Sequence, residues 1–141
     1  MPTFKSIAQL APVYARYQQT AAAGTAPDGF IFVNPTGSGD YYQIMEARAI
    51  YDVVGGASAA ADVKVVPSGT ALASGTTALA STFDLTATAR TPYSATLTTT
   101  MANRVVKPGD SIGVDTSGTL TGLTGLVIEV ILQPLKLRKQ Q

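Results

Sequence analysis

The clearest pattern in the chain is a strict alternation of residues from Gly125 to Gln133. The residues on one side of this segment are all apolar: Leu126, Ile128, Val130 and Leu132. Those on the other side are mixed: Val127, Glu129, Ile131 and Gln133. Because side chains alternate across a β-strand, the segment predicts a strand with one buried face. A strand buried on one side only is typical of an antiparallel sheet.

A second strand is predicted just before it, from Ser111 to Thr116, with Ile112 and Val114 on one face. The preceding residues 107–110 read Lys-Pro-Gly-Asp, in which Pro presets φ and Gly supplies a left-handed position, and we expect Asp110 to cap this turn. Residues 115–118, Asp-Thr-Ser-Gly, give a further turn signal. We expect the two strands to form a hairpin that closes a β-sandwich.

Further strands are predicted upstream, separated by Gly- and Pro-rich turns: Gly29–Val33, Tyr41–Val54, Asp62–Val66, Thr82–Thr88 and Tyr93–Thr99. The uninterrupted apolar run in the first of these predicts a buried strand. The second contains good helix formers, but its alternation favours a strand, with one face made of Met45, Ala47, Ala49, Tyr51 and Val53. Many short strands with turns between them predict an all-β fold, a jelly-roll-like antiparallel β-sandwich over residues 28–134.

Residues 1–27 differ from the rest in being rich in Ala and Gln and in having no acidic residue. Pro12 interrupts any helix, and we expect an extended N-terminal arm without which the sandwich still folds. Either the arm docks on a partner or it folds back on its own sheet. Its candidate docking residues are Phe4, Ile7, Leu10, Tyr14 and Tyr17. Residues 135–141 form a short basic tail, which is either solvated or meets an acidic partner.

Composition narrows the classes of function. The 141 residues suit one domain, and only 13% are charged, about half the usual share of roughly 25%. So few charges indicate either a partner-covered surface or a hydrated Ser/Thr-rich one. A net charge of +1 gives no field that attracts nucleic acid or membranes. With no apolar run of ~18 residues and no signal-peptide pattern, we expect no membrane span and synthesis in the cytoplasm.

Catalytic equipment is sparse. The chain has no Cys and no His, which excludes disulfides and any Ser-His-Asp or Cys-His site, so we expect no enzyme activity, metal or cofactor. Glu46 and Glu129 could in principle form a glycosidase pair, although lone Glu residues on strands usually face solvent. Carbohydrate binding or host attachment remains the alternative function, with possible stacking residues at Tyr41, Tyr42, Tyr51 and Tyr93.

The stretch from residue 79 to 134 carries a resemblance to known proteins. Its motif VKPGDSIGVD, followed by SGTLTGLTGLVIEV, resembles the cement (decoration) proteins of phage heads, especially those of short-tailed Bordetella phages. The resemblance implies a sandwich that sits on the outer surface of the virion. It also implies homodimers that clamp neighbouring subunits of the major capsid protein. Since the motif is a strand–turn–strand framework, it carries no catalytic residue.

Overall fold

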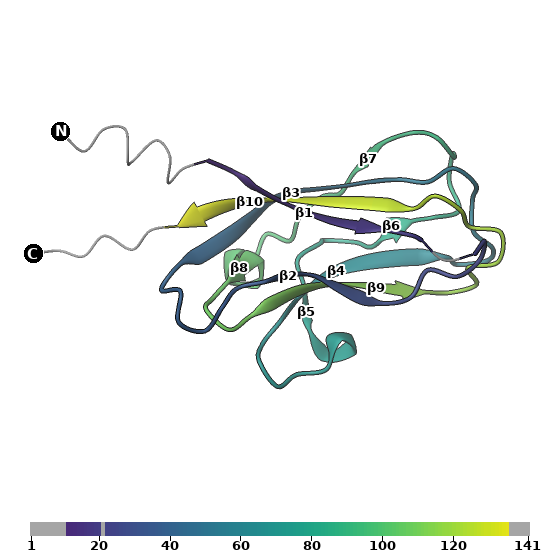
Figure 1. The fold of residues 1–141 in the computed structure, drawn as a ribbon. Helices are drawn as coiled ribbons and strands as arrows, with labels where there is room; N and C mark the ends of the chain where they lie inside the picture. The colour runs from purple at the N-terminus through teal and green to yellow at the C-terminus, as the bar shows by residue number, and fades with distance from the viewer. Residues whose placement is uncertain (1–10, 21, 136–141) are drawn as a thin grey trace, which may run out of the picture.

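The computed structural model describes residues 11–20 and 22–135, and these form two antiparallel sheets that face each other (Figure 1). Sheet A contains β1 (Val13–Gln18), β10 (Val127–Leu135), β3 (Tyr41–Ile50), β7 (Tyr93–Ser94) and β8 (Val105–Val106). Sheet B contains β2 (Gly29–Val33), β9 (Ser111–Ser117), β4 (Ala60–Val66), β5 (Thr76–Thr77) and β6 (Phe83–Asp84). Two short 3-10 turns, η1 (Leu72–Ser74) and η2 (Met101–Arg104), complete the elements. The predicted all-β fold is confirmed.

The strand order gives the sandwich its jelly-roll-like character. Sheet A runs β1-β10-β3-β7 with β8 also paired to β3, and sheet B runs β2-β9-β4-β5 with β6 also paired to β4. The first four strands alternate between the sheets, and so do β9 and β10. Both chain ends of the described sandwich lie in sheet A, where β1 pairs with β10. No helix in the described ranges is long and apolar enough to cross a membrane.

The core is the layer between the sheets, built from the alternating apolar positions. The predicted inward residues of β10, Ile128, Val130 and Leu132, have no exposed surface. Ile112 and Val114 of β9 and Val63 of β4 meet them from the opposite sheet and are equally buried. Burying a side chain of this size stabilises the fold by about 1.5–3 kcal/mol, and without disulfides this packing is the main stabilising term.

The predicted hairpin between β9 and β10 is wrong, because the two strands lie in different sheets. β9 pairs with β2 and β4, whereas β10 pairs with β1 and β3. The connecting residues 118–126 cross from one sheet to the other, helped by left-handed glycines at Gly118, Gly122 and Gly125. Each strand has one apolar face, and placing the strands in opposite sheets lets those faces pack against each other.

The predicted faces of β3 hold only for its second half. Ala47 and Ala49 point inward as expected, but Ile44 is fully buried and Met45 is 48% exposed, the reverse of the expectation. The cause is a β-bulge: consecutive residues of β10 pair with Ile44 and Glu46, which leaves Met45 as the extra residue. A bulge shifts the alternation by one residue and moves every earlier side chain to the other face.

Three other predicted strands differ from the structure. β2 is an edge strand of sheet B, paired only with β9, so Phe30 and Val33 are exposed rather than buried. The predicted strand over residues 82–88 ends at Asp84, whose Oδ1 accepts hydrogen bonds from the Thr86 N–H and hydroxyl and turns the chain. The strand predicted over residues 93–99 is only two residues long.

The N-terminal segment is not a separate arm over the residues that the structure describes. Val13–Gln18 forms β1, fully paired with β10, so the sandwich begins before residue 28. Ala15 and Tyr17 point into the core, and the Tyr17 hydroxyl donates a hydrogen bond to the Pro27 carbonyl oxygen at 2.9 Å. Of the two alternatives for this segment, these residues follow the one in which it folds back on its own sheet.

Candidate functional site

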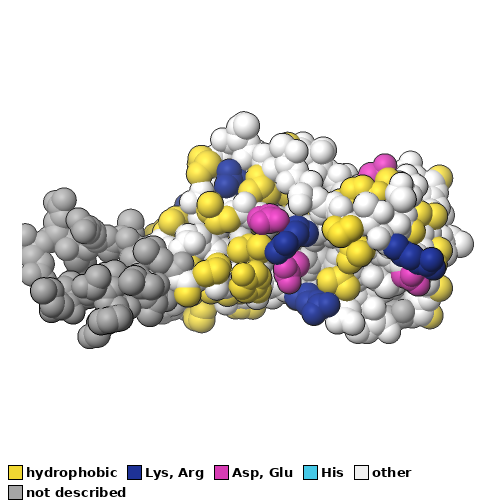
Figure 2. Space-filling model, turned by 90° about the horizontal axis from the view of Figure 1, so that it is seen from above, with side chains coloured by type: hydrophobic (Ala, Val, Ile, Leu, Met, Phe, Trp, Pro, Cys, Tyr) yellow, Lys and Arg dark blue, Asp and Glu magenta, His cyan; other side chains and the backbone are white. Residues whose placement is uncertain are grey.

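The outer face of sheet A carries ordered rows of side chains across its strands. The strand register places Tyr14 beside Ile131 and Glu46 in one row. The next row contains Arg16, Glu129 and Arg48, and the third contains Gln18, Val127 and Ile50. Figure 2 shows this face from above, with basic and acidic side chains gathered in its middle and hydrophobic ones on either side. The arrangement is an apolar surface divided by a band of charge.

Within the charged band, Arg48 is the central residue. Its Nη2 lies 3.0 Å from Glu129 Oε1 and its Nε lies 3.4 Å from Glu46 Oε1. All three side chains are more than a third exposed, so each ion pair contributes at most about 1 kcal/mol to stability. Arg16 sits directly across from Glu129 in the register, yet it forms no ion pair within residues 11–20 and 22–135.

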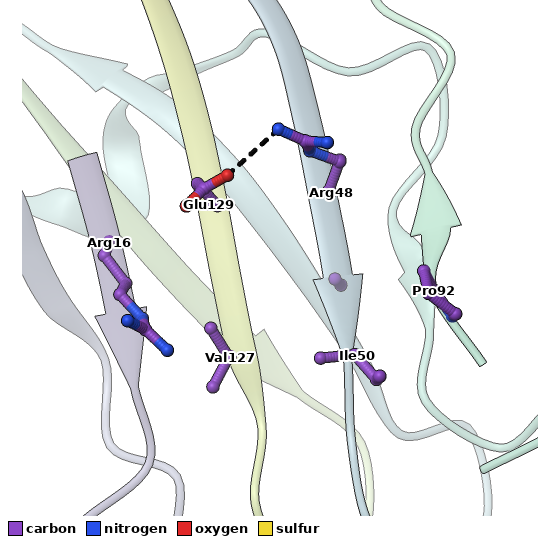
Figure 3. Close-up of a pocket in the computed structure, with 7 residues that line it drawn as sticks. Arg16, Arg48, Ile50, Pro92, Val127 and Glu129 are labelled. Atoms are coloured by element: carbon purple, nitrogen blue, oxygen red, sulfur yellow. Dashed lines mark hydrogen bonds and ion pairs between the residues drawn. The ribbon is translucent and has the colours of Figure 1, made fainter. Parts of the chain in front are cut away.

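A shallow depression of about 280 Å³ lies beside this band. It is bordered by Arg16, Glu129 and Arg48 on one side and by Val127, Ile50 and Pro92 on the other (Figure 3). Figure 3 shows the Arg16 side chain extending along β1 towards the level of Val127, and the Arg48 guanidinium turned towards Glu129. This volume is slightly below the range of about 300–1,000 Å³ that is typical of small-molecule sites.

The sequence-predicted docking residues are only partly brought to this face. Tyr14 projects from β1 and is 59% exposed, so it remains a candidate contact. Tyr17 is buried, and burial, followed by the nearby Asp28 carboxylate, raises the pKa of its phenol. The structure therefore makes Tyr17 a core residue. Phe4, Ile7 and Leu10 lie outside the described residues, and their docking role stays a prediction.

The remaining candidates for chemistry are occupied by structural contacts. Glu46 and Glu129 both bind the Arg48 guanidinium on an open sheet face, an arrangement unlike two carboxyls across a sugar-binding cleft. Tyr51 is buried, and its ring stacks on that of Tyr93 at 6.0 Å between centroids. Burial, the interaction with the Tyr93 hydroxyl and the charge of Asp84 raise the pKa of Tyr51 to about 12.

The acidic residues on sheet B and its turns have structural partners as well. Asp110 Oδ2 accepts the Lys107 N–H at 3.1 Å, which confirms its predicted capping role. Asp115 pairs with Lys64 at 2.6 Å, and Asp62 accepts a hydrogen bond from the Thr77 hydroxyl. In the described part of the chain, no group of three or more acidic residues is arranged to hold a metal ion.

Sequence reasoning missed Arg16, Ile50 and Pro92 as members of one surface. These residues come from three segments far apart in the chain, and only the order β1-β10-β3-β7 brings them together. The signal available for β1 was the period-two pattern Val13, Ala15, Tyr17, with Arg16 between inward residues. We instead expected this segment to be an extended arm, with Tyr14 and Tyr17 as docking residues, and did not assign it to the sheet.

Comparison with known proteins supports the fold. No protein-family model matches the chain, and no curated protein matches it. A chain in the structure of the capsid of Ralstonia phage GP4 is similar, with a TM-score of 0.53 and 20% identity over 92% of this chain and 86% of that one. A chain in the cyanophage Pam1 capsid asymmetric unit has a TM-score of 0.49 and 13% identity, covering 88% and 84%. The likeness to the Ralstonia phage chain shows that the two proteins share a β-sandwich fold.

Proposed function

We propose that this chain is a structural virion protein that binds the outside of an icosahedral phage capsid and cements neighbouring major capsid protein subunits. The observation that carries the proposal is the shared fold with a chain of the Ralstonia phage GP4 capsid, which extends over 92% of this protein. The resemblance of residues 79–134 to phage cement proteins points the same way. The homodimer that this resemblance implies is part of the proposal.

The surface of the molecule supports a binding role. Large apolar side chains stand exposed on both sheets, including Tyr14, Met45 and Ile50 on sheet A and Phe30 and Val33 on β2. Clusters of exposed apolar residues mark interaction surfaces more often than isolated ones do. The charged groups nearby are largely paired with one another, so the face can be covered by a partner at a modest cost in desolvation.

A cement protein acts by mass action. It binds the assembled shell and has little affinity for separate subunits, so each bound copy shifts the equilibrium towards the assembled state. A modest interface per copy is sufficient because the shell offers many equivalent sites. Rigidity helps, since a preformed sandwich loses little conformational entropy on binding. The close-packed core described above supplies that rigidity.

The proposal is tested by mixing the purified full-length protein with empty shells assembled from the major capsid protein of the same phage. Co-sedimentation should saturate at a fixed stoichiometry, and decorated shells should withstand higher temperature than bare ones. Absence of saturable binding, with shells of intact morphology, would reject the proposal. Sedimentation velocity of the free protein tests the homodimer separately.

A further inference from the structure

We propose that the depression on sheet A binds a segment of the major capsid protein in which an acidic residue adjoins an aliphatic one, with Arg16 receiving the carboxylate. This inference rests on the proposed function and names the chemistry of the contact. Three features of the described residues support it. Among these residues Arg16 is a cation without an ion pair, apolar side chains lie next to it, and the neighbouring Glu129 is already paired with Arg48.

The first step is the state of Arg16. In the row Arg16, Glu129, Arg48, the central carboxylate could serve either arginine, since each is its direct neighbour in the register. It is engaged by Arg48 at 3.0 Å. Arg48 is held on its other side by Glu46, which fixes the guanidinium between two acids. Arg16 is therefore left exposed and without an ion pair in the part of the chain that the structure describes.

The second step is the surface next to that cation. Val127 and Ile50 occupy the following row of the sheet, and Pro92 closes the far side of the depression. Ile50 is 37% exposed, although it is aliphatic. Covering these side chains with an aliphatic residue would remove apolar surface from water, which favours binding. The depression therefore favours a ligand with an apolar side chain beside a negative charge.

The third step is charge complementarity. Of the residues that border the depression, two are arginines and one is a glutamate, which leaves a net charge of +1. A guanidinium binds a carboxylate through paired hydrogen bonds, which fix orientation as well as adding energy. The segments of this chain outside the structure cannot supply the carboxylate from a side chain, because residues 1–10 and 136–141 contain no Asp or Glu. We therefore assign the carboxylate to the capsid protein.

The chemistry of the site is tested without shells. The probe is the blocked peptide acetyl-Gly-Asp-Leu-Gly-amide, titrated into the ¹⁵N-labelled full-length protein while amide shifts are followed by NMR. We expect saturable shifts concentrated at Arg16, Ile50 and Val127, with a dissociation constant on the order of 1 mM. Peptides with Asn for Asp or Gly for Leu should bind at least about fivefold more weakly. Absence of localised shifts, or equal shifts with all three peptides, would overturn the proposal.

Variants then tie the site to the shell. Arg16→Glu should weaken both peptide and shell binding at least about tenfold, whereas Arg16→Lys should weaken them less, because it keeps the positive charge but loses the paired hydrogen bonds. Lys107→Glu is the matched control, since it makes the same charge change at an exposed position near the opposite end of β3. If the wild-type protein and Arg16→Glu bind shells equally, the inference fails and the cement function stands. If the peptide binds at Arg16 but shells do not bind at all, the capsid partner and the proposed function both fail.

Discussion

Gln19, the residue after β1, is hydrogen-bonded to Leu126, the residue before β10. The Gln19 N–H donates to the Leu126 carbonyl oxygen at 2.8 Å, and the Leu126 N–H donates to Gln19 Oε1 at 3.1 Å. The Gln19 side-chain nitrogen also donates to the carbonyl oxygens of Leu123 and Thr25. Because Gln19 is buried, water cannot replace these bonds, so one amide side chain joins the end of β1 to the crossover that leads into β10.

This relationship predicts a large effect of a single substitution. Gln19→Ala would leave a buried N–H and two carbonyl oxygens without their side-chain partner, and we expect a loss of roughly 2–3 kcal/mol in the free energy of unfolding. Urea denaturation measures it. The control is Gln18→Ala, which changes the exposed last residue of β1 and should stay within about 0.5 kcal/mol of wild type. Equal stabilities of the two variants would contradict the role assigned to Gln19.

Truncation separates the N-terminal residues into two parts. Deleting residues 1–27 removes β1 with the buried side chains of Ala15 and Tyr17 and exposes the edge of β10, so we expect an unfolded or aggregated product. This replaces the sequence-based expectation that the sandwich folds without them. Deleting residues 1–10 leaves every described contact in place and should preserve the melting temperature within a few degrees. Near-ultraviolet circular dichroism and thermal melts distinguish these outcomes, and a cooperative melt of the longer deletion would refute the argument.

The crossover between the sheets depends on Gly118. Its φ is +76°, and a Cβ there would overlap the carbonyl oxygen of Ser58. Gly39 has a similar φ of +68° but open space around it. We therefore expect Gly39→Ala to cost about 1 kcal/mol, from the left-handed conformation alone, and Gly118→Ala to cost at least about 2 kcal/mol more. Chemical denaturation of both variants measures the difference, and similar losses would show that the close contact does not matter.

Replacing Asp62 with Asn is expected to raise the free energy of unfolding at neutral pH but not at acidic pH. Burial, together with the like charge of Asp115 at the facing position of β9, raises the pKa of Asp62, although the hydrogen bond from Thr77 and the charge of Lys64 act the other way. A raised folded-state pKa means that stability is full below the unfolded pKa of about 3.9 and is lost as pH rises through the folded value. Asp62→Asn should therefore stabilise the protein at pH 7, by roughly 0.2–1 kcal/mol, and leave it unchanged below about pH 3.5.

Asp84 provides the comparison of opposite sign. Hydrogen bonds from the Thr86 hydroxyl and N–H hold its pKa below the usual range, so its contribution is present above the unfolded pKa and lost on acidification. Asp84→Asn should lower the melting temperature slightly at pH 7 and have no effect near pH 2. Thermal melts of both variants across this pH range test the assignment. A destabilised Asp62→Asn at neutral pH would contradict it.

The sequence allowed the buried faces of individual strands to be predicted, because these depend only on the alternation of neighbouring residues. The inward faces of β10 and β9 followed directly from period-two patterns, because a half-buried strand has to keep its apolar side towards the core. The bulge at Met45 was not predictable, since one extra residue leaves no local mark. Nor was the separation of β9 and β10, because a turn sequence does not specify whether the chain returns to the same sheet.

The candidate site could not be predicted from the sequence, because it too depends on how the strands pair. Arg16, Glu129 and Arg48 are separated in the chain by tens of residues, and their juxtaposition depends on which strands are neighbours. Glu129 was correctly placed on the mixed face of its strand, but its partners could not be named. Tyr14 and Tyr17 were both predicted as docking residues of an extended arm, and Tyr14 is exposed whereas Tyr17 is buried. In a strand, residues three positions apart lie on opposite faces.

The central claim is that this sandwich binds the outside of a phage shell and joins its subunits. Cryo-electron microscopy of empty shells incubated with saturating full-length protein tests it most directly. We predict density of this fold on the outer surface, bridging adjacent capsid subunits, with the Arg16 side of sheet A against the coat. Shells that show no added density at saturation, or density only on the inner surface, would contradict it.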